Sequence, residues 1–590
     1  MTLTIDGRQF TVEKGKSVLQ AAIENGINVP YYCYHPGIGV DGNCRVCLVK
    51  IEKMPKLQVS CSITATEGMV VYTNTPDVIE ARAGVFEFLL INHPLDCPVC
   101  DKGGECPLQD FSYSFGPKGS RMEFPRRTFD GEGVKADVDF GPTLMLNRNR
   151  CILCTRCVRF MKEIDGDAQI GIVDRGYGSE IATFEEQGVH SLLSGNLMDV
   201  CPVGAITTRD YRFKSRPWDN PNAVDTTCTL CERGCSTTAW IRSKPEWAKG
   251  SQLIRMTPRF DPSNNGYWMC DIGRFQYHWV EEGPRLVQPL VRAKDGLGAV
   301  TWDAALAAAA AGLAGSTRWL VSAHASHEEL FALARLAQEL QGDAARQAVT
   351  VTWTSSTKPQ PAQTKFQVPA VDAPNVAGAR ALGLVDASAT APSTEPLRQA
   401  VEGGTVETVF VLHPGPTAAL GDVQWLVDAK KSGKVRTLIV QAVLESPLTE
   451  VADVVLPGAT WLEKDAAYTN SQGSIRRASQ AVLPIAQARE DWKILAELAT
   501  VLGKSLGFDS LTALRQELAR LAGGAAEFEG LAALGADRPR SARNWLQASN
   551  PSERWKWDFL FQDLPPVKFH NLHAAAQSAV SQVIPLKPVE

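Results

Sequence analysis

The chain has 590 residues, and 60 Lys and Arg against 65 Asp and Glu give a formal net charge of -5. Hydrophobic residues make up 44% and charged residues 21%, which excludes a short disulfide-stapled fold and a disordered polyelectrolyte. No window holds 18 consecutive apolar residues, so we expect a soluble chain without a membrane span. A near-neutral balance without a basic stripe argues against nucleic acid as a partner. The first residues lack a basic segment followed by an apolar core, so we expect no secretory signal and a cytosolic location.

The first 26 residues predict the start of a ferredoxin-like β-grasp domain. Residues 3–5 and 9–12 alternate in polarity around Asp6-Gly7, which is a hairpin signal. Ser17 and Gln20 form a capping box for a helix that stops at Gly26. Strand, strand and helix in this order begin a β-grasp fold.

Cysteine is the most informative residue type in the chain. All fifteen cysteines lie between residues 33 and 270, and the remaining 320 residues contain none. In a reducing compartment, thiols in C-x2-C spacing indicate metal ligands rather than disulfides. The odd total also argues against full pairing. The cysteines divide into four groups, and no thiol is left over.

The first group follows the predicted helix, in a loop whose three glycines let the backbone wrap a cluster and direct its amides at the sulfurs. Its first gap is longer than that of plant-type ferredoxins. We expect a 2Fe-2S cluster, with a four-thiolate zinc site as the alternative. The expected ligands are Cys33, Cys44, Cys47 and Cys61.

The second group offers three thiolates and one imidazole. His93 lies about one turn before the first of these cysteines, and without it the group would have only three ligands. We expect a 4Fe-4S cluster whose imidazole ligand reduces the negative charge around the iron and raises the potential. A zinc site with the same ligands is the alternative. The expected ligands are His93, Cys97, Cys100 and Cys106.

The third and fourth groups each predict one further 4Fe-4S cluster. The third has the C-x2-C-x2-C run followed by a distant Cys-Pro that is typical of ferredoxins. The third set is Cys151, Cys154, Cys157 and Cys201, and the fourth is Cys228, Cys231, Cys235 and Cys270. One 2Fe-2S and three 4Fe-4S clusters would carry about 14 iron atoms in all.

The cysteine-free half predicts an α/β fold. Residues 301–313 and 328–341 have the pattern of helices, residues 319–322 that of a short strand, and residues 406–412 and 437–441 that of buried parallel strands. Residues 355–374 are rich in Ser, Thr, Pro and Gln, which predicts a loop or linker. Gly403-Gly404 and residues 413–416 predict turns rather than phosphate-binding loops, since neither gives a G-x-G-x-x-G.

The order of the four groups resembles the large iron-sulfur subunit of bacterial NADH-quinone oxidoreductase, which belongs to the peripheral arm of respiratory complex I. The resemblance covers about the first 280 residues, and it is most specific in residues 146–160, LNRNRCILCTRCVRF, and residues 199–206, DVCPVGAI. Two later segments, residues 285–292 and 452–473, resemble molybdopterin-dependent oxidoreductases such as formate dehydrogenase.

The resemblance implies a function, a route and a set of partners. Electrons that left NADH through a flavin on another subunit would pass the Cys33 cluster, the Cys151 cluster and the His93 cluster in that order, while the Cys228 cluster would lie off the route. Implied partners are the flavin- and NADH-binding subunit, the small 2Fe-2S subunit, the two-cluster ferredoxin-like subunit and the quinone-module subunits. The implied location is the cytoplasmic face of the inner membrane, with membrane contact only through the complex. The chain itself shows no flavin or NADH motif, and we name no catalytic residue.

Four hypotheses remain open at this stage, and the first is the electron-transfer subunit described above. A molybdopterin-dependent formate dehydrogenase α chain would use its own active site, but no Cys follows Cys270 to bind molybdenum. Ser or Asp can replace that ligand, yet the second half is also short, so we expect no molybdopterin. An iron-only hydrogenase would need further cysteines in that half. A zinc-stapled scaffold is the non-enzyme alternative.

The expected architecture is an α+β iron-sulfur region, with β-grasp 2Fe-2S and 4Fe-4S ferredoxin-like modules, followed by a degenerate α/β molybdopterin-oxidoreductase-like domain. We expect the 2Fe-2S domain over residues 1–80 and three 4Fe-4S segments over residues 81–140, 141–220 and 221–278. The α/β domain would cover residues 279–590 and end in a Trp- and Pro-rich tail from residue 544, which packs on itself or forms a strap over a partner subunit.

Overall fold

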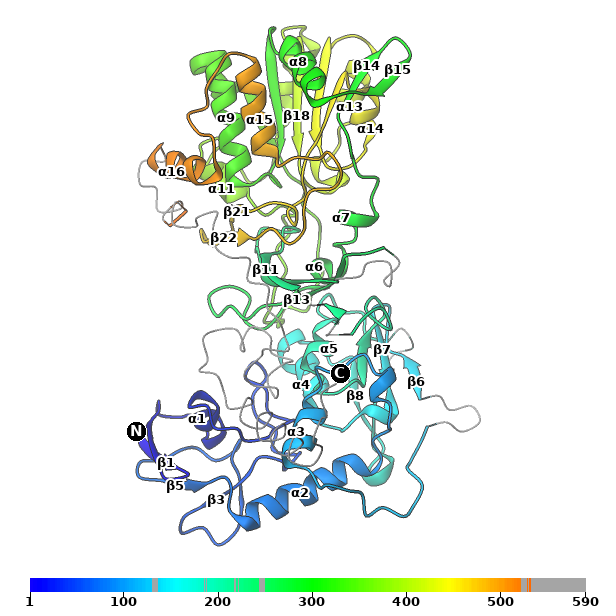
Figure 1. Ribbon diagram of the computed structural model, residues 1–590, viewed down its shortest axis with the longest axis vertical. Coiled ribbons are helices and arrows are strands. Elements are labelled where there is room, and N and C mark those ends of the chain that lie inside the picture. The colour runs from blue at the N-terminus through cyan, green and yellow to red at the C-terminus, as the bar shows by residue number, and fades with distance from the viewer. Residues whose placement is uncertain are drawn as a thin grey trace, which may run out of the picture.

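The computed structural model describes residues 1–129, 136–184, 186, 188–216, 219–220, 222–242, 250–521, 528 and 530–531. They form an elongated body in which the iron-sulfur region lies at one end and a large α/β sheet at the other (Figure 1). Among these residues, no helix combines the length and the hydropathy that crossing a membrane requires. The predicted tail from residue 544 lies outside the described residues.

The N-terminal domain is a β-grasp, as the sequence predicts. Its five-stranded sheet has the order β2-β1-β5-β3-β4. Asp6 and Gly7 take φ angles of 47° and 79° at the hairpin turn, and the capping box between Ser17 and Gln20 forms. The elements are β1 (Thr2–Ile5), β2 (Arg8–Thr11), α1 (Val18–Glu24), β3 (Leu48–Ile51), β4 (Gln58–Val59) and β5 (Val70–Tyr72).

The next segment consists of short elements joined by long loops. One sheet has the order β10-β7-β6, and β8 pairs with β9. One apolar core runs from the β-grasp domain through this segment, so the two are a continuous unit. The elements are α2 (Pro76–Ile91), α3 (Pro107–Phe115), β6 (Asp137–Asp139), β7 (Leu144–Asn147), α4 (Arg156–Phe160), β8 (Ile170–Val173), β9 (Glu180–Thr183), α5 (Asn196–Val200) and β10 (Ile206–Thr208).

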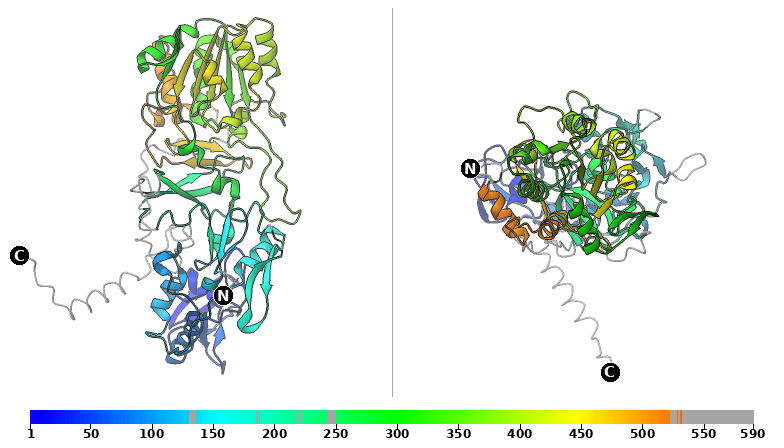
Figure 2. Two further views of the ribbon diagram at one scale, coloured as in Figure 1. Left: turned by 90° about the vertical axis from the view of Figure 1, so that its right-hand side faces the viewer. Right: turned by 90° about the horizontal axis from the view of Figure 1, so that it is seen from above.

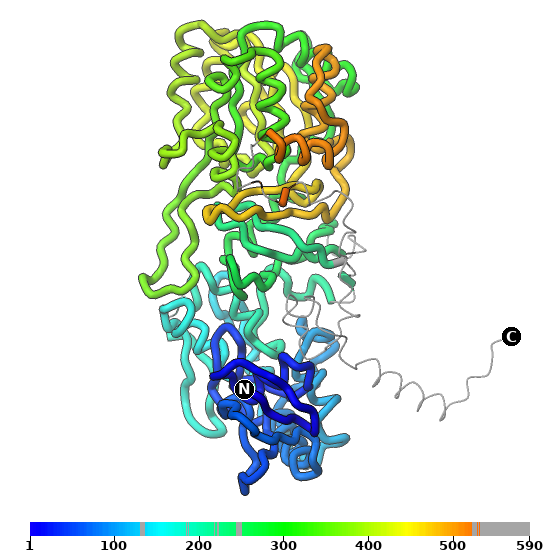
Figure 3. The backbone as a smooth tube through the Cα atoms, turned by 90° about the vertical axis from the view of Figure 1, so that its left-hand side faces the viewer, coloured from blue at the N-terminus to red at the C-terminus, as the bar shows by residue number. Residues whose placement is uncertain are grey.

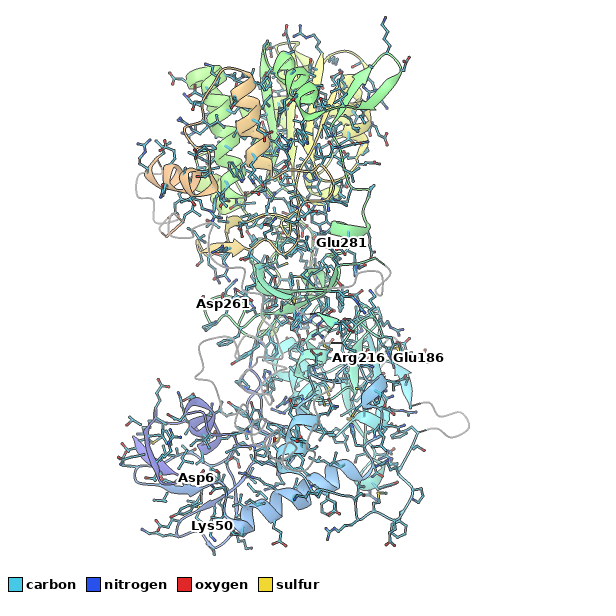
Figure 4. All side chains as sticks on the ribbon, in the orientation of Figure 1. Asp6, Lys50, Glu186, Arg216, Asp261 and Glu281 are labelled. Atoms are coloured by element: carbon cyan, nitrogen blue, oxygen red, sulfur yellow. The ribbon has the colours of Figure 1, made fainter. Side chains whose placement is uncertain are left out.

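A three-stranded antiparallel sheet, β11-β12-β13, forms the middle of the body. A hairpin from much later in the chain packs on it, and both contribute to one apolar cluster. Asp261, which is labelled beside the middle sheet in Figure 4, accepts a hydrogen bond from Arg476 of that hairpin. The elements are β11 (Asn222–Thr227), β12 (Ser236–Ile241), β13 (Leu253–Pro258), α6 (Asp271–Phe275), α7 (Trp279–Glu282), β21 (Ala466–Thr469) and β22 (Ile475–Ala478).

The α/β domain is built on a seven-stranded sheet with the order β15-β14-β20-β19-β18-β16-β17. The predicted central strands are confirmed and run parallel. The elements are β14 (Leu290–Ala293), β15 (Gly296–Ala299), α8 (Trp302–Gly312), β16 (Thr317–Ser322), α9 (His327–Gln341), α10 (Ala345–Ala348), β17 (Val349–Thr352), α11 (Val376–Ala381), α12 (Glu395–Glu402), β18 (Thr408–His413), α13 (Gln424–Lys431), β19 (Thr437–Ala442), α14 (Pro447–Val451), β20 (Val454–Pro457), α15 (Asp491–Val501) and α16 (Leu511–Leu521).

Helices cover both faces of this sheet, which explains the continuous apolar strands in the sequence. Phe410 and Leu412 contribute to the core beneath α8, α9 and α15. The alternating residues of the same strand, Val409 and Val411, contribute to the core beneath α12 and α13. Alternate residues of one strand therefore serve two separate cores.

Residues 355–374, which we call the interdomain strap, form a long loop that extends from the α/β domain to the iron-sulfur region (Figures 2 and 3). The predicted loop is confirmed, but it is anchored at its tip. The Lys365 amide donates to the Ile164 carbonyl at 2.8 Å. Phe366 is only 4% exposed within the iron-sulfur core, and the Arg233 guanidinium lies 4.6 Å from the centre of its ring. The strap thus joins the two halves of the chain.

Replacing Phe366 by Ala should loosen this junction. Truncating a buried aromatic ring leaves a cavity and costs about 3–5 kcal/mol of unfolding free energy. We expect a lower unfolding temperature and faster proteolytic cleavage within the strap. Phe124→Ala is the control, because Phe124 is 79% exposed and should change the unfolding free energy by less than about 0.5 kcal/mol. Equal behaviour of the two variants would contradict the anchoring role.

Candidate metal centres

The first predicted ligand group is gathered at the edge of the β-grasp domain. Cys33, Cys47 and Cys61 are buried, and Cys44 is partly exposed. The Cys33 amide lies 3.5 Å from the Cys44 sulfur. Hydrogen bonds from the Cys44 and Cys61 thiols, and from the backbone N–H of Gly42, lower the pKa of Cys33. The glycine loop therefore aims an amide at a sulfur, as the sequence predicts.

The second group lines a cavity of about 160 Å³. All four predicted ligands contribute to it: His93, Cys97, Cys100 and Cys106. Burial, together with the nearby Arg150 cation, lowers the pKa of His93 to about 4, so its ring is neutral at pH 7. The buried Nδ1 of His93 has no hydrogen-bond partner within the described part of the chain. Three sulfurs and one neutral imidazole around a cavity match the donor set of the predicted cluster.

Gly204 closes one wall of this cavity. A Cβ atom at this position would overlap the Cys100 sulfur. Only glycine allows the backbone to approach the ligand group this closely.

The third group spans the loop before α4, the first turn of α4 and the residue that follows α5. Cys154, Cys157 and Cys201 are buried, and Cys151 is partly exposed. Burial raises the pKa of Cys151 to about 12 and that of Cys154 to about 11. The Leu153 amide lies 3.4 Å from the Cys151 sulfur. Thiolates could form in this interior only beside positive charge, which iron would supply.

The loop of the third group is strained. Leu153 and Thr155 have φ angles of 51° and 63°, a region that L-residues, and β-branched ones above all, rarely occupy. These two residues flank Cys154. Strain of this kind concentrates at functional sites.

The fourth group is wholly buried, with three members between β11 and β12 and the fourth directly before α6. Its members are Cys228, Cys231, Cys235 and Cys270. The Cys228 amide donates to the Cys235 carbonyl at 2.9 Å, which closes the loop. A Cβ on Gly273 would lie only 2.9 Å from the Cys228 sulfur. Burial raises the pKa of Cys270 to about 12.

The members of each predicted set lie near one another. Across the described ranges, no three or more His, Cys, Asp or Glu side chains are arranged so that they could hold a metal ion. The ligand assignments rest on sequence spacing, proximity and burial.

Neighbouring groups adjoin one another. Cys33 and Cys154 influence each other electrostatically, and Asn43 donates to the Leu153 carbonyl at 3.2 Å between their loops. A second cavity, of about 240 Å³, is lined by both His93 and Cys151. The third group thus adjoins both the first and the second.

A buried polar cluster lies near the carboxyl ends of the strands of the α/β sheet. Ligands of such sheets bind beyond the carboxyl ends of the strands. Here Lys464 is buried at that edge and forms ion pairs with Glu329 and with Asp491, the latter at 2.9 Å. Gln441, near the end of β19, donates to the Asp491 carboxylate at 2.9 Å.

Four family models match separate parts of the chain. They are described as "2Fe-2S iron-sulfur cluster binding domain" for residues 1–76, "NADH-ubiquinone oxidoreductase-G iron-sulfur binding region" for 82–121, "NADH-quinone oxidoreductase subunit 3, ferredoxin-like domain" for 141–207, and "Molybdopterin oxidoreductase" for 376–501. The iron-sulfur modules and the molybdopterin-oxidoreductase-like domain expected from the sequence are confirmed.

Curated relatives extend this match over most of the chain. The mitochondrial 78 kDa subunit of NADH-ubiquinone oxidoreductase from Neurospora crassa is 30% identical over 634 residues, which cover 88% of this chain and 83% of that protein. The chain belongs to the NADH-quinone oxidoreductase-G family. The member from Streptomyces coelicolor is 40% identical over 57% of this chain, and that from Rickettsia bellii is 40% identical over 52%.

The matched segments span 39% of the Streptomyces protein and 43% of the Rickettsia one. A chain of a solved structure, titled "Crystal structure of NAD+-reducing [NiFe]-hydrogenase in the H2-reduced state", is 29% identical, covering 37% of this chain and 93% of that chain. Its TM-score is 0.33, which does not establish a shared arrangement.

Several residues of this NADH-quinone oxidoreductase-G chain lie close to the predicted ligand groups but could not be identified from the sequence. Gly204 and Gly273 approach sulfurs closely. Glu105 and Arg255 form a buried ion pair at 2.7 Å between the second-group segment and the middle sheet. Arg156 is buried completely between the first and third groups. The position of Arg156 between two ligand cysteines was visible in the sequence, but the partner loop that it contacts was not.

Gly204→Ala should disrupt the second group selectively. The added methyl group collides with the Cys100 sulfur, so we expect loss of about four iron atoms per chain and of one cluster signal in electron paramagnetic resonance (EPR). Gly84→Ala, in helix α2, is the matched control, because a Cβ there meets nothing within 4 Å. Full iron content in Gly204→Ala would show that the second group does not bind a cluster at this wall.

Proposed function

We propose that this chain is the electron-transfer subunit of an NADH-quinone oxidoreductase, which passes electrons from a flavin-containing module toward quinone. The observation that carries this proposal is that the third ligand group adjoins both the first and the second. Family membership supports the same role. The chain would supply an electron conduit, while hydride transfer from NADH would take place on a partner.

The proposed cofactors are one 2Fe-2S and three 4Fe-4S clusters, held by the four ligand groups described above. Such clusters accept and release single electrons. The protein contributes ligand spacing, burial and amide hydrogen bonds to sulfur, which together set reduction potential. The fourth group is proposed to lie off the main route.

The proposed partners are the flavin- and NADH-binding subunit, the small 2Fe-2S subunit, the two-cluster ferredoxin-like subunit and the quinone-module subunits. Contact with the membrane would be indirect, at its cytoplasmic face. The α/β domain is proposed to bind no molybdopterin, since Lys464, Glu329 and Asp491 form a buried cluster near the carboxyl ends of its strands. It would serve shape and docking.

Elemental analysis of the anaerobically purified protein tests the cofactor proposal. Four filled sites predict about 14 iron atoms per chain, with matching acid-labile sulfide and little molybdenum. Stoichiometric molybdenum would instead indicate a formate dehydrogenase-like enzyme, and zinc in place of iron would indicate a structural scaffold.

Cys154→Ser tests the route. Loss of a third-group thiolate should remove that cluster and reduce NADH-to-quinone turnover per assembled complex to background. Cys228→Ser removes a ligand of the fourth group and should leave turnover per assembled complex largely intact. Normal turnover in Cys154→Ser, with its cluster absent by EPR, would refute the proposed order.

A further inference from the structure

Arg156 occupies an unusual place for a cation. Its side chain is 0% exposed, at the start of α4 and between two ligands of the third group. It donates hydrogen bonds to the backbone carbonyls of Tyr34, in the first-group loop, and of Val200, the latter at 3.4 Å. Arginine keeps its charge even when buried. A full positive charge therefore lies at the contact between two ligand loops.

The groups around Arg156 show which charges it faces. The Cys154, Cys33 and Cys44 sulfurs all act on it electrostatically, with Cys154 foremost, as does the Tyr31 hydroxyl. Its own backbone N–H donates to Cys154. Sulfurs of the first and third groups therefore both lie within the field of one guanidinium.

The contact between the two loops is held by further bonds. Arg159, one turn later, donates to the Cys33 carbonyl and, at 3.2 Å, to the Gly39 carbonyl. Thr155 donates to the Asp41 carboxylate at 2.7 Å. These contacts hold the two loops together on either side of Arg156.

We propose that Arg156 is a positioning residue shared by the Cys33 and Cys151 clusters, whose buried charge raises the reduction potentials of both. The inference rests on the proposed function, since it requires both clusters. Reduction adds one negative charge to a cluster, and a nearby cation in a medium of low dielectric constant stabilises that charge. The cation also weakens the repulsion between two reduced neighbours. The effect should be larger for the Cys151 cluster, because Cys154 is its foremost electrostatic partner.

EPR-monitored redox titration of the assembled complex tests this role. Arg156→Gln keeps a donor for the Tyr34 carbonyl but loses the charge, so the equilibrium constant for reduction of the Cys151 cluster should fall at least about tenfold, or about 59 mV for a one-electron centre. The Cys33 cluster should shift in the same direction by less. Arg156→Lys keeps the charge and should retain both equilibrium constants within about threefold.

Two internal controls separate charge from general damage. The His93 cluster of the same sample should not shift. Arg515→Gln removes an equally buried guanidinium from the α/β domain and should leave both potentials unchanged. Unshifted potentials in Arg156→Gln, or equal shifts in the Gln and Lys variants, would overturn the proposal.

The remaining outcomes are also decisive. If Arg156→Gln fails to assemble the two clusters while Arg156→Lys assembles them, the charge is required and the proposal is supported. If both variants lose the clusters, the guanidinium acts through its shape and the proposal is wrong. Absence of both cluster signals from the unmodified protein would instead refute the proposed function itself.

Discussion

The burial of sulfur near sulfur is the constraint on which the iron-sulfur region depends. Most of the predicted ligand cysteines are withdrawn from water, and a thiolate in that interior needs compensating charge or hydrogen bonds. Few helices and strands in this region are long enough to supply them. Loops with positive φ angles, as at Leu153 and Gly42, do so by turning backbone amides inward. In this half of the chain the loops therefore supply the groups that surround the sulfurs. The short helices and strands hold these loops in place.

Packing between distant segments compensates for that irregularity. The late hairpin β21–β22 supports the fourth group: Arg476 donates to the Gly234 carbonyl at 3.1 Å, and Asn470 donates to the Arg233 carbonyl at 3.2 Å. Glu105 and Arg255 join the second group to the middle sheet. The α/β domain has a core on each face of its sheet. The strap and the β21–β22 hairpin extend from this domain and contact the first half of the chain.

Local signals in the sequence predicted local structure well. The Asp6-Gly7 hairpin, the capping box at Ser17 and the parallel strands around Phe410 depend on neighbouring residues or on hydrophobic pattern, and all formed. Residues 355–374 were predicted to be a loop, but not to bury Phe366 in a core built from the first half of the chain. The contact of Arg156 with the first-group loop could not be predicted from the sequence either. Composition identifies a loop or a cation, whereas its partner is set by the tertiary fold.

The strap has a consequence for how the protein is made. The iron-sulfur core includes Phe140, Ile206 and Cys270, yet Phe366 of the strap comes 96 positions after Cys270. At synthesis rates of about 5–20 residues per second, the ribosome needs roughly 5–19 seconds to span that interval. During this time one side of the nascent N-terminal half is uncovered. The order of residues along the chain thus leaves an interval for cofactor delivery before the strap covers that side.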